Sequence, residues 1–358
     1  MLRHPLWGAI CLLAVSLVLC TDKLCTDARP SAYALLVDDD DDEEDGGDGS
    51  SSFSFSSPQA TPDELAFGFY DGTCPNAEAV VASTVRELFA GDPNVAAALV
   101  RLFFHDCFVH GCDASVLLDR IGGGGKSEKD AAPNRSLRGF GAVDKIKARL
   151  EKQCPGTVSC ADILALAARD SLVLVGGPTY PVLTGRRDSA GSFYDDVNIP
   201  APNATYAMTL SAFARRGFTE RETVALLGAH SIGKVQCRFF RDRIYNFAGT
   251  GEPDDSLDAD MVGEMRAVCS GDGAAPMEMG YYRQGREVGF GAHYYAKLLA
   301  GRGILRSDQQ LTAGSTVRWV RAYASGHRGE EAFREDFAHA MVKLSGNTLS
   351  FFLKIAQV

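Results

Sequence analysis

Chemically capable side chains gather in one short segment, residues 100–115. Its first half is an apolar run that carries Arg101 and His105, four residues apart, so the two would share one face of a helix. A cation and a titratable base would then point into one pocket. Asp106 lies about 100° around that helix and must serve a different site. The spacing therefore predicts an acid–base pair with a second polar site directly behind it.

The second half of this segment has the composition of a metal-binding loop. Cys107 and Cys112 lie five residues apart and can close a small disulfide loop. Asp106, Asp113 and Ser115 offer the hard oxygen ligands that calcium takes. The simpler alternative is a core helix with a satisfied histidine, followed by an acidic surface loop. Burying this many polar groups is costly unless they have a function, which favours the site.

Helical patterns must position these residues, and strand signals are few and short. Asp92 is the expected N-cap of the helix that carries His105, with Pro93 at its first position. Thr219 and Glu222 form a capping box before a second apolar helix, which ends near His230. The expected helices cover residues 77–90, 94–107, 139–152, 160–172, 205–216, 220–229, 235–246, 257–269, 292–300 and 331–345.

The segment 100–115 resembles the distal signature of the plant secretory haem peroxidases (class III). Residues 224–237, VALLGAHSIGKVQC, resemble the proximal haem-ligand segment of the same family. Taken alone, His230 could instead be a histidine that caps a helix C-terminus. Further motifs follow in the family's order over nearly all of 65–345: Phe69-Tyr70, Thr73-Cys74-Pro75, Arg138-Gly139-Phe140, Val158-Ser159-Cys160-Ala161-Asp162, Gly185-Arg186-Arg187-Asp188 and Pro200-Ala201-Pro202.

The resemblance implies a mostly α-helical, two-lobed fold with one haem b between a distal and a proximal helix. It makes His230 the axial iron ligand, with Asp308 accepting a hydrogen bond from its other ring nitrogen. It also makes Phe104 a haem contact and places the docking point of phenolic donors at Pro200. The implied activity is that of a secreted haem peroxidase, which reduces hydrogen peroxide and oxidises small phenols by one-electron steps.

The implied catalytic residues are His105, Arg101 and Asn134. His105 would carry a proton between the two oxygens of peroxide, a role worth typically ~10²–10⁴-fold in rate. Arg101 would lower the pKa of this histidine and stabilise the negative charge that develops as the O–O bond breaks. Asn134 would accept a hydrogen bond from the other ring nitrogen and so fix the tautomer.

The resemblance also implies metal ligands and disulfides. The distal calcium ligands would be Asp106, Val109, Gly111, Asp113 and Ser115, with Glu128 reaching the ion through water. The implied disulfides are Cys74–Cys154, Cys107–Cys112 and Cys237–Cys269. His110, inside the calcium loop, is expected to face solvent.

Two departures from the family's pattern stand out. Ser231 matches the first ligand of a second, proximal calcium site, but Arg283, Arg286 and Gly291 stand where the family has oxygen ligands. One calcium is therefore expected. The family's C-terminal cysteine is also missing, which would leave Cys160 without a partner in the domain; Cys25, in the linker, is the only other candidate. The alternative function is a secreted protein that keeps the peroxidase fold with lost or weak activity.

The remaining organisation follows from composition. The chain has 358 residues, and residues 1–20 have the charge and length of a signal peptide, too short for a membrane span. Residues 21–64 are an acidic, serine-rich linker or propeptide, and the peroxidase domain would cover 65–358, with an atypical tail at 348–358. The formal net charge is −10, but residues 38–45 supply eight negative charges, so the rest is nearly neutral and no nucleic-acid surface is indicated. We expect a secreted monomer, in the cell wall or vacuole, with no membrane span.

Overall fold

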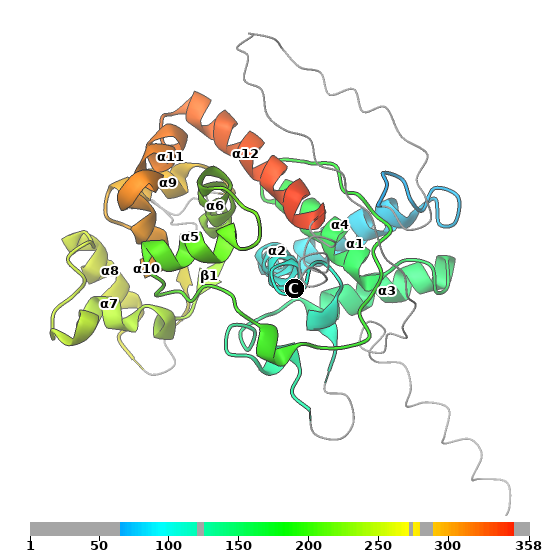
Figure 1. Cartoon of the computed structure of the whole chain (residues 1–358), viewed down its shortest axis with the longest axis horizontal. Coiled ribbons are helices and arrows are strands. Elements are labelled where there is room, and N and C mark those ends of the chain that lie inside the picture. The colour runs from blue at the N-terminus through cyan, green and yellow to red at the C-terminus, as the bar shows by residue number, and fades with distance from the viewer. Residues whose placement is uncertain (1–64, 120–124, 272–274, 280–288, 347–358) are drawn as a thin grey trace, which may run out of the picture.

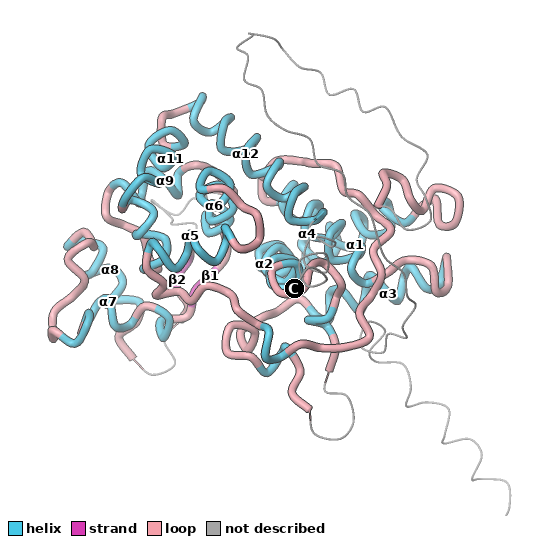
Figure 2. The backbone as a smooth tube through the Cα atoms, viewed as in Figure 1, coloured by secondary structure: helices cyan, strands magenta, loops and turns pink. Residues whose placement is uncertain are grey.

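The computed structural model of the chain describes residues 65–119, 125–271, 275–279 and 289–346. The predicted signal peptide, linker and tail lie outside the described residues, as do Arg283 and Arg286. Helices dominate the described part, which confirms the predicted mostly α-helical fold (Figures 1 and 2).

The helices and strands have the following bounds. The helices are α1 (Ala77–Gly91), α2 (Asn94–Cys107), α3 (Phe140–Gln153), α4 (Cys160–Leu174), α5 (Tyr206–Ala214), α6 (Glu220–Leu227), α7 (Arg241–Tyr245), α8 (Ala259–Val268), α9 (His293–Leu299), α10 (Arg306–Gln309), α11 (Val317–Tyr323) and α12 (His327–Gly346). The strands are β1 (Lys234–Val235) and β2 (Met277–Glu278), which pair antiparallel with Lys234 opposite Glu278.

Helix α2 lies at the centre of the fold and packs most extensively against α4. Its apolar face, with Leu99 and Leu102, is fully buried. The helix begins at Asn94, where the expected range 94–107 begins, but its N-cap is Pro93 and not Asp92. Asp92 still contributes, because its Oδ1 accepts the backbone N–H of Asn94 at 3.0 Å. The core thus fixes α2, and the polar residues along it are held in a rigid frame.

Helix α12 joins the two halves of the molecule. It packs against α6 on one side and against α2 on the other (Figure 1). One large apolar cluster runs through α1–α4, α6, α9, α11 and α12. A second, smaller cluster lies around α7, α8 and the two short strands. The distal and proximal helices are therefore packed into one continuous core.

The capping box of Thr219 and Glu222 is present, as predicted, at the start of α6. The helix ends at Leu227, and a 3₁₀ turn, Gly228–Ser231, follows and carries His230. A side chain at Gly228 would collide with the rings of Tyr295 and Phe333. Close packing of this turn against α9 and α12 therefore sets where His230 lies.

Three disulfides join the pairs that the resemblance implies: Cys74–Cys154, Cys107–Cys112 and Cys237–Cys269. The sulfur of Cys160 is disulfide-bonded too, and its partner is not a cysteine of the domain, as expected. The other described cysteines pair among themselves, so the partner of Cys160 lies outside the described residues. The first residue of α4 is thus covalently tethered.

Candidate active site

The distal part of the site is a hydrogen-bonded group on α2 and the loop that precedes α3. His105 is 5% exposed, and its Nδ1 lies 2.7 Å from Oδ1 of Asn134. Arg101 Nε donates to Nε2 of His105 at 3.3 Å, as their spacing on one helix face predicts. Because an amide oxygen only accepts, Nδ1 must carry the proton, and Nε2 is left as the acceptor. This is the tautomer that a general base needs.

Electrostatics keep His105 neutral. Burial, the charge of Arg101 and, more weakly, His230 lower its pKa to about 3, against the opposing effect of the Asn134 hydrogen bond. Arg101 is exposed as a residue, but partial desolvation of its guanidinium lowers the pKa to about 10, so it stays charged at neutral pH. A neutral base therefore stands beside a permanent cation over the whole physiological range.

The backbone carbonyls of the loop before α3 orient Arg101. Its Nη1 donates to the carbonyl of Ser136 at 3.2 Å, and its Nη2 donates to the carbonyl of Pro133 at 3.1 Å. Asn134 is fixed in turn, because its Nδ2 donates to the carbonyl of Glu128 at 2.9 Å. These contacts leave the guanidinium and the imidazole little freedom to turn away from each other.

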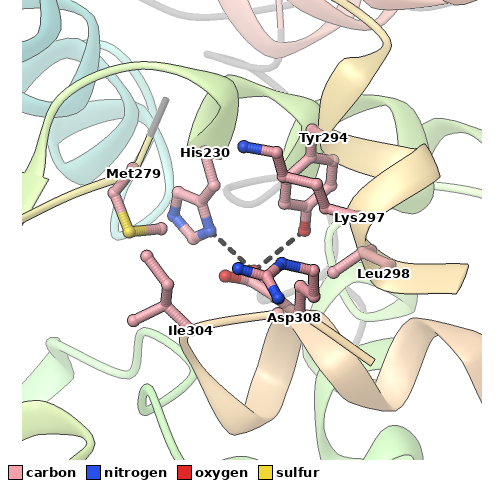
Figure 3. Close-up of a pocket in the computed structure, with 9 residues that line it drawn as sticks. His230, Met279, Tyr294, Lys297, Leu298, Ile304 and Asp308 are labelled. Carbon is pink, nitrogen blue, oxygen red and sulfur yellow. Dashed lines mark hydrogen bonds and ion pairs between the residues drawn. The ribbon is translucent and has the colours of Figure 1, made fainter. Parts of the chain in front are cut away.

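The proximal part of the site is centred on His230 and Asp308. Nδ1 of His230 lies 2.7 Å from Oδ1 of Asp308, which is 1% exposed (Figure 3). Tyr294 donates to the same oxygen at 2.9 Å. Burial alone would lower the pKa of His230, but the charge and hydrogen bond of Asp308 outweigh it and raise the pKa. A cavity of about 20 Å³ adjoins these residues.

The distal and proximal groups lie close enough to influence each other. His230 contributes to the lowered pKa of His105, and Arg101 acts in the same direction on His230. Each histidine has Nδ1 engaged by an oxygen acceptor. His230 thus keeps Nε2 for a group that would lie between them, whereas Nε2 of His105 accepts the hydrogen bond from Arg101.

Buried carboxylates form a cluster behind α2. Burial raises the pKa of Asp106 well above its usual range, and the nearby charges of Asp113 and Glu128 add to this effect. The pKa values of Asp113 and Glu128 are raised too, chiefly by burial. Ser115 Oγ and Glu128 Oε2 are buried and make no hydrogen bond of normal geometry among the described residues. A cation would satisfy these oxygens and reverse the unfavourable electrostatics.

The loop that carries the remaining implied calcium ligands is closed by the Cys107–Cys112 disulfide. Val109 is buried, and Gly111 has a φ of 99°, a conformation that favours glycine. No three His, Cys, Asp or Glu side chains within the described ranges converge as a ready-made metal site. The implied set relies instead on two carboxylates supplemented by a hydroxyl and backbone carbonyls.

His110 does not face solvent, contrary to the expectation. Its Nε2 lies 2.8 Å from Oδ2 of Asp196, and its ring packs against Phe193 with the centroids 4.2 Å apart. Asp196 lies 86 residues away in the chain, so the local pattern gave no sign of it. His110 therefore ties the loop closed by Cys107–Cys112 to the 3₁₀ turn Tyr194–Asp196.

Phe104 and Pro200 lie near the site without direct contacts that define a role. The ring of Phe104 stacks on Phe108 at 4.7 Å and meets His105 edge-on at 6.1 Å. Pro200 is half-buried in the loop before α5, and this loop is held by a bond from the Ser307 amide to the Pro202 carbonyl at 3.0 Å. The loop thus reaches the residue next to Asp308.

Comparison with known proteins decides the family. The Peroxidase family model matches residues 81–326. Putative Peroxidase 48 of Arabidopsis thaliana is 42% identical over 318 residues, covering 78% of each chain. Peroxidase 28 of Arabidopsis thaliana is 45% identical over 287 residues, which cover 78% of this chain and 87% of that one. Peroxidase C2 of Armoracia rusticana is 41% identical over 289 residues, covering 78% and 82%.

The chain belongs to the class III plant peroxidase family. It is homologous to horseradish peroxidases, which are haem enzymes, and class III peroxidases bind haem and calcium.

The surroundings of Ser231 show how this peroxidase fills the region of the doubtful proximal calcium. Ser231 is buried, and its Oγ accepts the backbone N–H of Gly291 at 3.3 Å. Glu330 accepts the N–H of Ala292 at 2.6 Å and pairs with Arg334 at 2.6 Å. The described oxygens here are thus occupied by backbone donors and by an internal cation.

Some functional contacts of this peroxidase were not predicted from its sequence. Tyr294 and the Glu330–Arg334 pair approach the site from α9 and α12, and the resemblance assigned them no role. Tyr294 lies next to a second tyrosine, a pair that looks like ordinary helix core. Only the tertiary contact with Asp308 distinguishes it.

Proposed function

We propose that this chain is a secreted haem peroxidase that reduces hydrogen peroxide and oxidises small phenols. The observation that carries the proposal is the pair of histidines, each held by a different acceptor. His105 is kept neutral by burial and Arg101, while His230 is made a stronger base by Asp308. One imidazole thus suits proton transfer and the other suits metal ligation.

The residues present fit a haem. Nδ1 of His230 is hydrogen-bonded to Asp308, so Nε2 remains for an iron. The side chain of His230 is 38% exposed, so a ligand can reach it, whereas the carboxylate of Asp308 is 1% exposed. When bound, haem would supply an iron that takes up peroxide and accepts single electrons from donors. The hydrogen bond to Asp308 would hold the ring orientation and raise its donor strength.

The distal residues would move the proton. Nε2 of His105 accepts a proton from one oxygen of hydrogen peroxide and returns it to the other oxygen as the O–O bond breaks. Arg101 stabilises the negative charge on the departing oxygen. Asn134 keeps the proton on Nδ1 throughout, so that Nε2 is ready again after each cycle. The overall reaction converts one peroxide and two phenols into two waters and two phenoxyl radicals.

The distal carboxylates would bind one calcium ion. Asp106, Asp113 and Ser115 bring oxygens together, and Glu128 would reach the ion through water. Ser115 Oγ and Glu128 Oε2 are buried and have no hydrogen-bond partner among the residues that the structure describes. Val109 and Gly111 would add carbonyl oxygens. Asn134 links this site to catalysis, because it bonds the carbonyl of Glu128 and Nδ1 of His105.

The proposal includes secretion. The chain carries disulfides, which persist in oxidising compartments, and class III peroxidases are secretory. The first 20 residues would act as the signal peptide. Helices long and apolar enough to cross a membrane do not occur in the described part of the chain. Phenolic donors would dock near Pro200.

A second candidate function is a secreted protein with the peroxidase fold but lost or weak activity. The described oxygens around Ser231 and Gly291 favour it, because they accept backbone N–H groups in the region where the family binds a second calcium. The intact distal group favours the enzyme, and we regard the enzyme as the better supported.

A visible absorption spectrum of secreted, purified chain separates the two candidates. The enzyme predicts a Soret band, rapid change on addition of peroxide, and turnover with a phenolic donor. As a matched control, His327, exposed and paired with Glu331, is replaced by alanine and should leave the spectrum and turnover unchanged. Chain that secretes in folded form without a Soret band would support the inactive candidate.

A further inference from the structure

One oxygen of Asp308 serves two donors. Its Oδ1 accepts a hydrogen bond from His230 Nδ1 at 2.7 Å and another from the hydroxyl of Tyr294 at 2.9 Å. Figure 3 shows both bonds meeting at this carboxylate from opposite sides of the pocket. The proposed iron ligand therefore shares its acceptor with a tyrosine.

The tyrosine is a permanent donor. Tyr294 is 6% exposed, and burial raises its pKa well above the usual range, with the charge of Asp308 adding to the effect. Its hydroxyl is therefore protonated at neutral pH. The carboxylate beside it is 1% exposed, so water does not screen this contact. The hydrogen bond is accordingly a fixed feature of the pocket.

Two donors on one carboxylate oxygen compete for the same electron density. Each bond withdraws negative charge that the other would otherwise use, so the tyrosine weakens the pull of Asp308 on the His230 proton. A weaker pull leaves the imidazole less anionic and a poorer electron donor through Nε2. The axial ligand's identity and its hydrogen bonds are among the levers by which a protein sets the potential of haem iron.

We infer that Tyr294 is a positioning residue that limits the donor strength of His230 through their shared hydrogen-bond acceptor, Asp308. The inference rests on the proposed function, because it takes His230 as the ligand of haem iron. It adds a third member to the His230–Asp308 pair.

The neighbouring residue supplies a matched control. Tyr295 is fully buried on the same helix, and its hydroxyl donates to the carbonyl of Val224 on α6 at 2.9 Å. Replacing either tyrosine by phenylalanine removes one buried hydroxyl from α9. Only Tyr294→Phe removes a donor from Asp308, so a purely structural effect should appear in both variants.

The test uses the haem-loaded chain and two measurements. The first is the ratio of ferric to ferrous haem at a fixed solution potential. The second is the frequency of the iron–histidine stretching vibration in the ferrous form. A hydrogen bond is worth about 0.5–1.5 kcal/mol net, so Tyr294→Phe should raise the ferric-to-ferrous ratio by about two- to tenfold. The stretch should move to higher frequency. Tyr295→Phe should change neither. In an Asp308→Asn background, Tyr294→Phe should have a much smaller effect, because the two residues act through one contact.

Several results would overturn the inference. An unchanged ratio in Tyr294→Phe, a shift toward the ferrous form, or equal shifts in the two tyrosine variants would each mean that the hydroxyl only packs. Failure of the proposed function looks different: the unaltered chain would not load haem, or His230→Ala would load it with an unchanged spectrum.

Discussion

Replacing Arg101 by leucine should change both the rate of reaction with peroxide and its dependence on pH. The arginine donates to Nε2 of His105 at 3.3 Å and is, after burial, the second cause of that histidine's low pKa of about 3. Leucine removes the cation while keeping an apolar chain on the same helix face. The pH dependence of the rate therefore reports the effect of Arg101 on the pKa of His105, and the rate at neutral pH reports its stabilisation of the developing negative charge.

The expected magnitudes follow from the geometry. Two unit charges about 4 Å apart interact by about 1 kcal/mol in water and about 4 kcal/mol at an effective dielectric constant of 20. Because Arg101 is exposed, we take the low end, which corresponds to about one pKa unit. The acid limb of the rate profile, below which His105 is protonated and inactive, should thus move from near pH 3 to near pH 4. At neutral pH the rate should fall by about 10²–10³-fold, the usual cost of losing one charge-stabilising group.

Stopped-flow measurement of the reaction with peroxide between pH 3 and 8 tests this directly. Arg101→Lys keeps the charge and should leave the acid limb in place. Arg135→Leu is the matched control, because Arg135 lies nearby and donates to the carbonyl of Asp130, away from the distal histidine. The reasoning would be refuted if Arg101→Leu did not move the acid limb, or if its rate at neutral pH lay within threefold of that of the unaltered chain.

Four further predictions concern the support of the site and of the fold. Asn134→Val should slow the reaction with peroxide by at least about tenfold in stopped-flow measurements, since the histidine loses its fixed tautomer; an unchanged rate would count against that role. Metal analysis after exhaustive dialysis should find one calcium per chain, and finding two would contradict the account. With calcium removed by a chelator, thermal stability should fall as the pH rises from 5 to 7, because the buried carboxylates around Asp106 have raised pKa values and lose protons that stabilise the folded state. Added calcium should remove this loss. Cys160→Ser breaks a disulfide and should lower the melting temperature by about 5 °C or more in calorimetry, whereas equal melting points would show the bridge to be dispensable.

Local patterns predicted the helices that build the distal half. The expected ranges for α1 to α4 agree with the structure to within two residues, because these helices have continuous apolar faces and recognisable ends. The range 235–246 was expected to be one helix. It is instead a short strand, a 3₁₀ turn and α7, since pairing with β2 and the Cys237–Cys269 bridge override local helix preference. Helix α11 was missed, because charged residues interrupt its short apolar stripe.

The same division holds for the site. The four-residue spacing of Arg101 and His105 is a local relation, and the structure has the contact. The partner of His110 and the hydroxyl on Asp308 come from residues distant in the chain, where no periodicity connects them. The partner of Cys160 lies outside the domain, as the positions of the cysteines in the sequence predict.

The central claim is that His230 binds haem iron while His105 transfers protons, and one pair of variants tests it most directly. Haem-loaded His105→Ala should keep a nearly unchanged Soret band and react with peroxide at least about 10²-fold more slowly. His230→Ala, prepared in parallel, should fail to retain haem through gel filtration. If the two variants behave alike, or if His230→Ala retains haem and His105→Ala loses it, the assignment of the two sides is wrong.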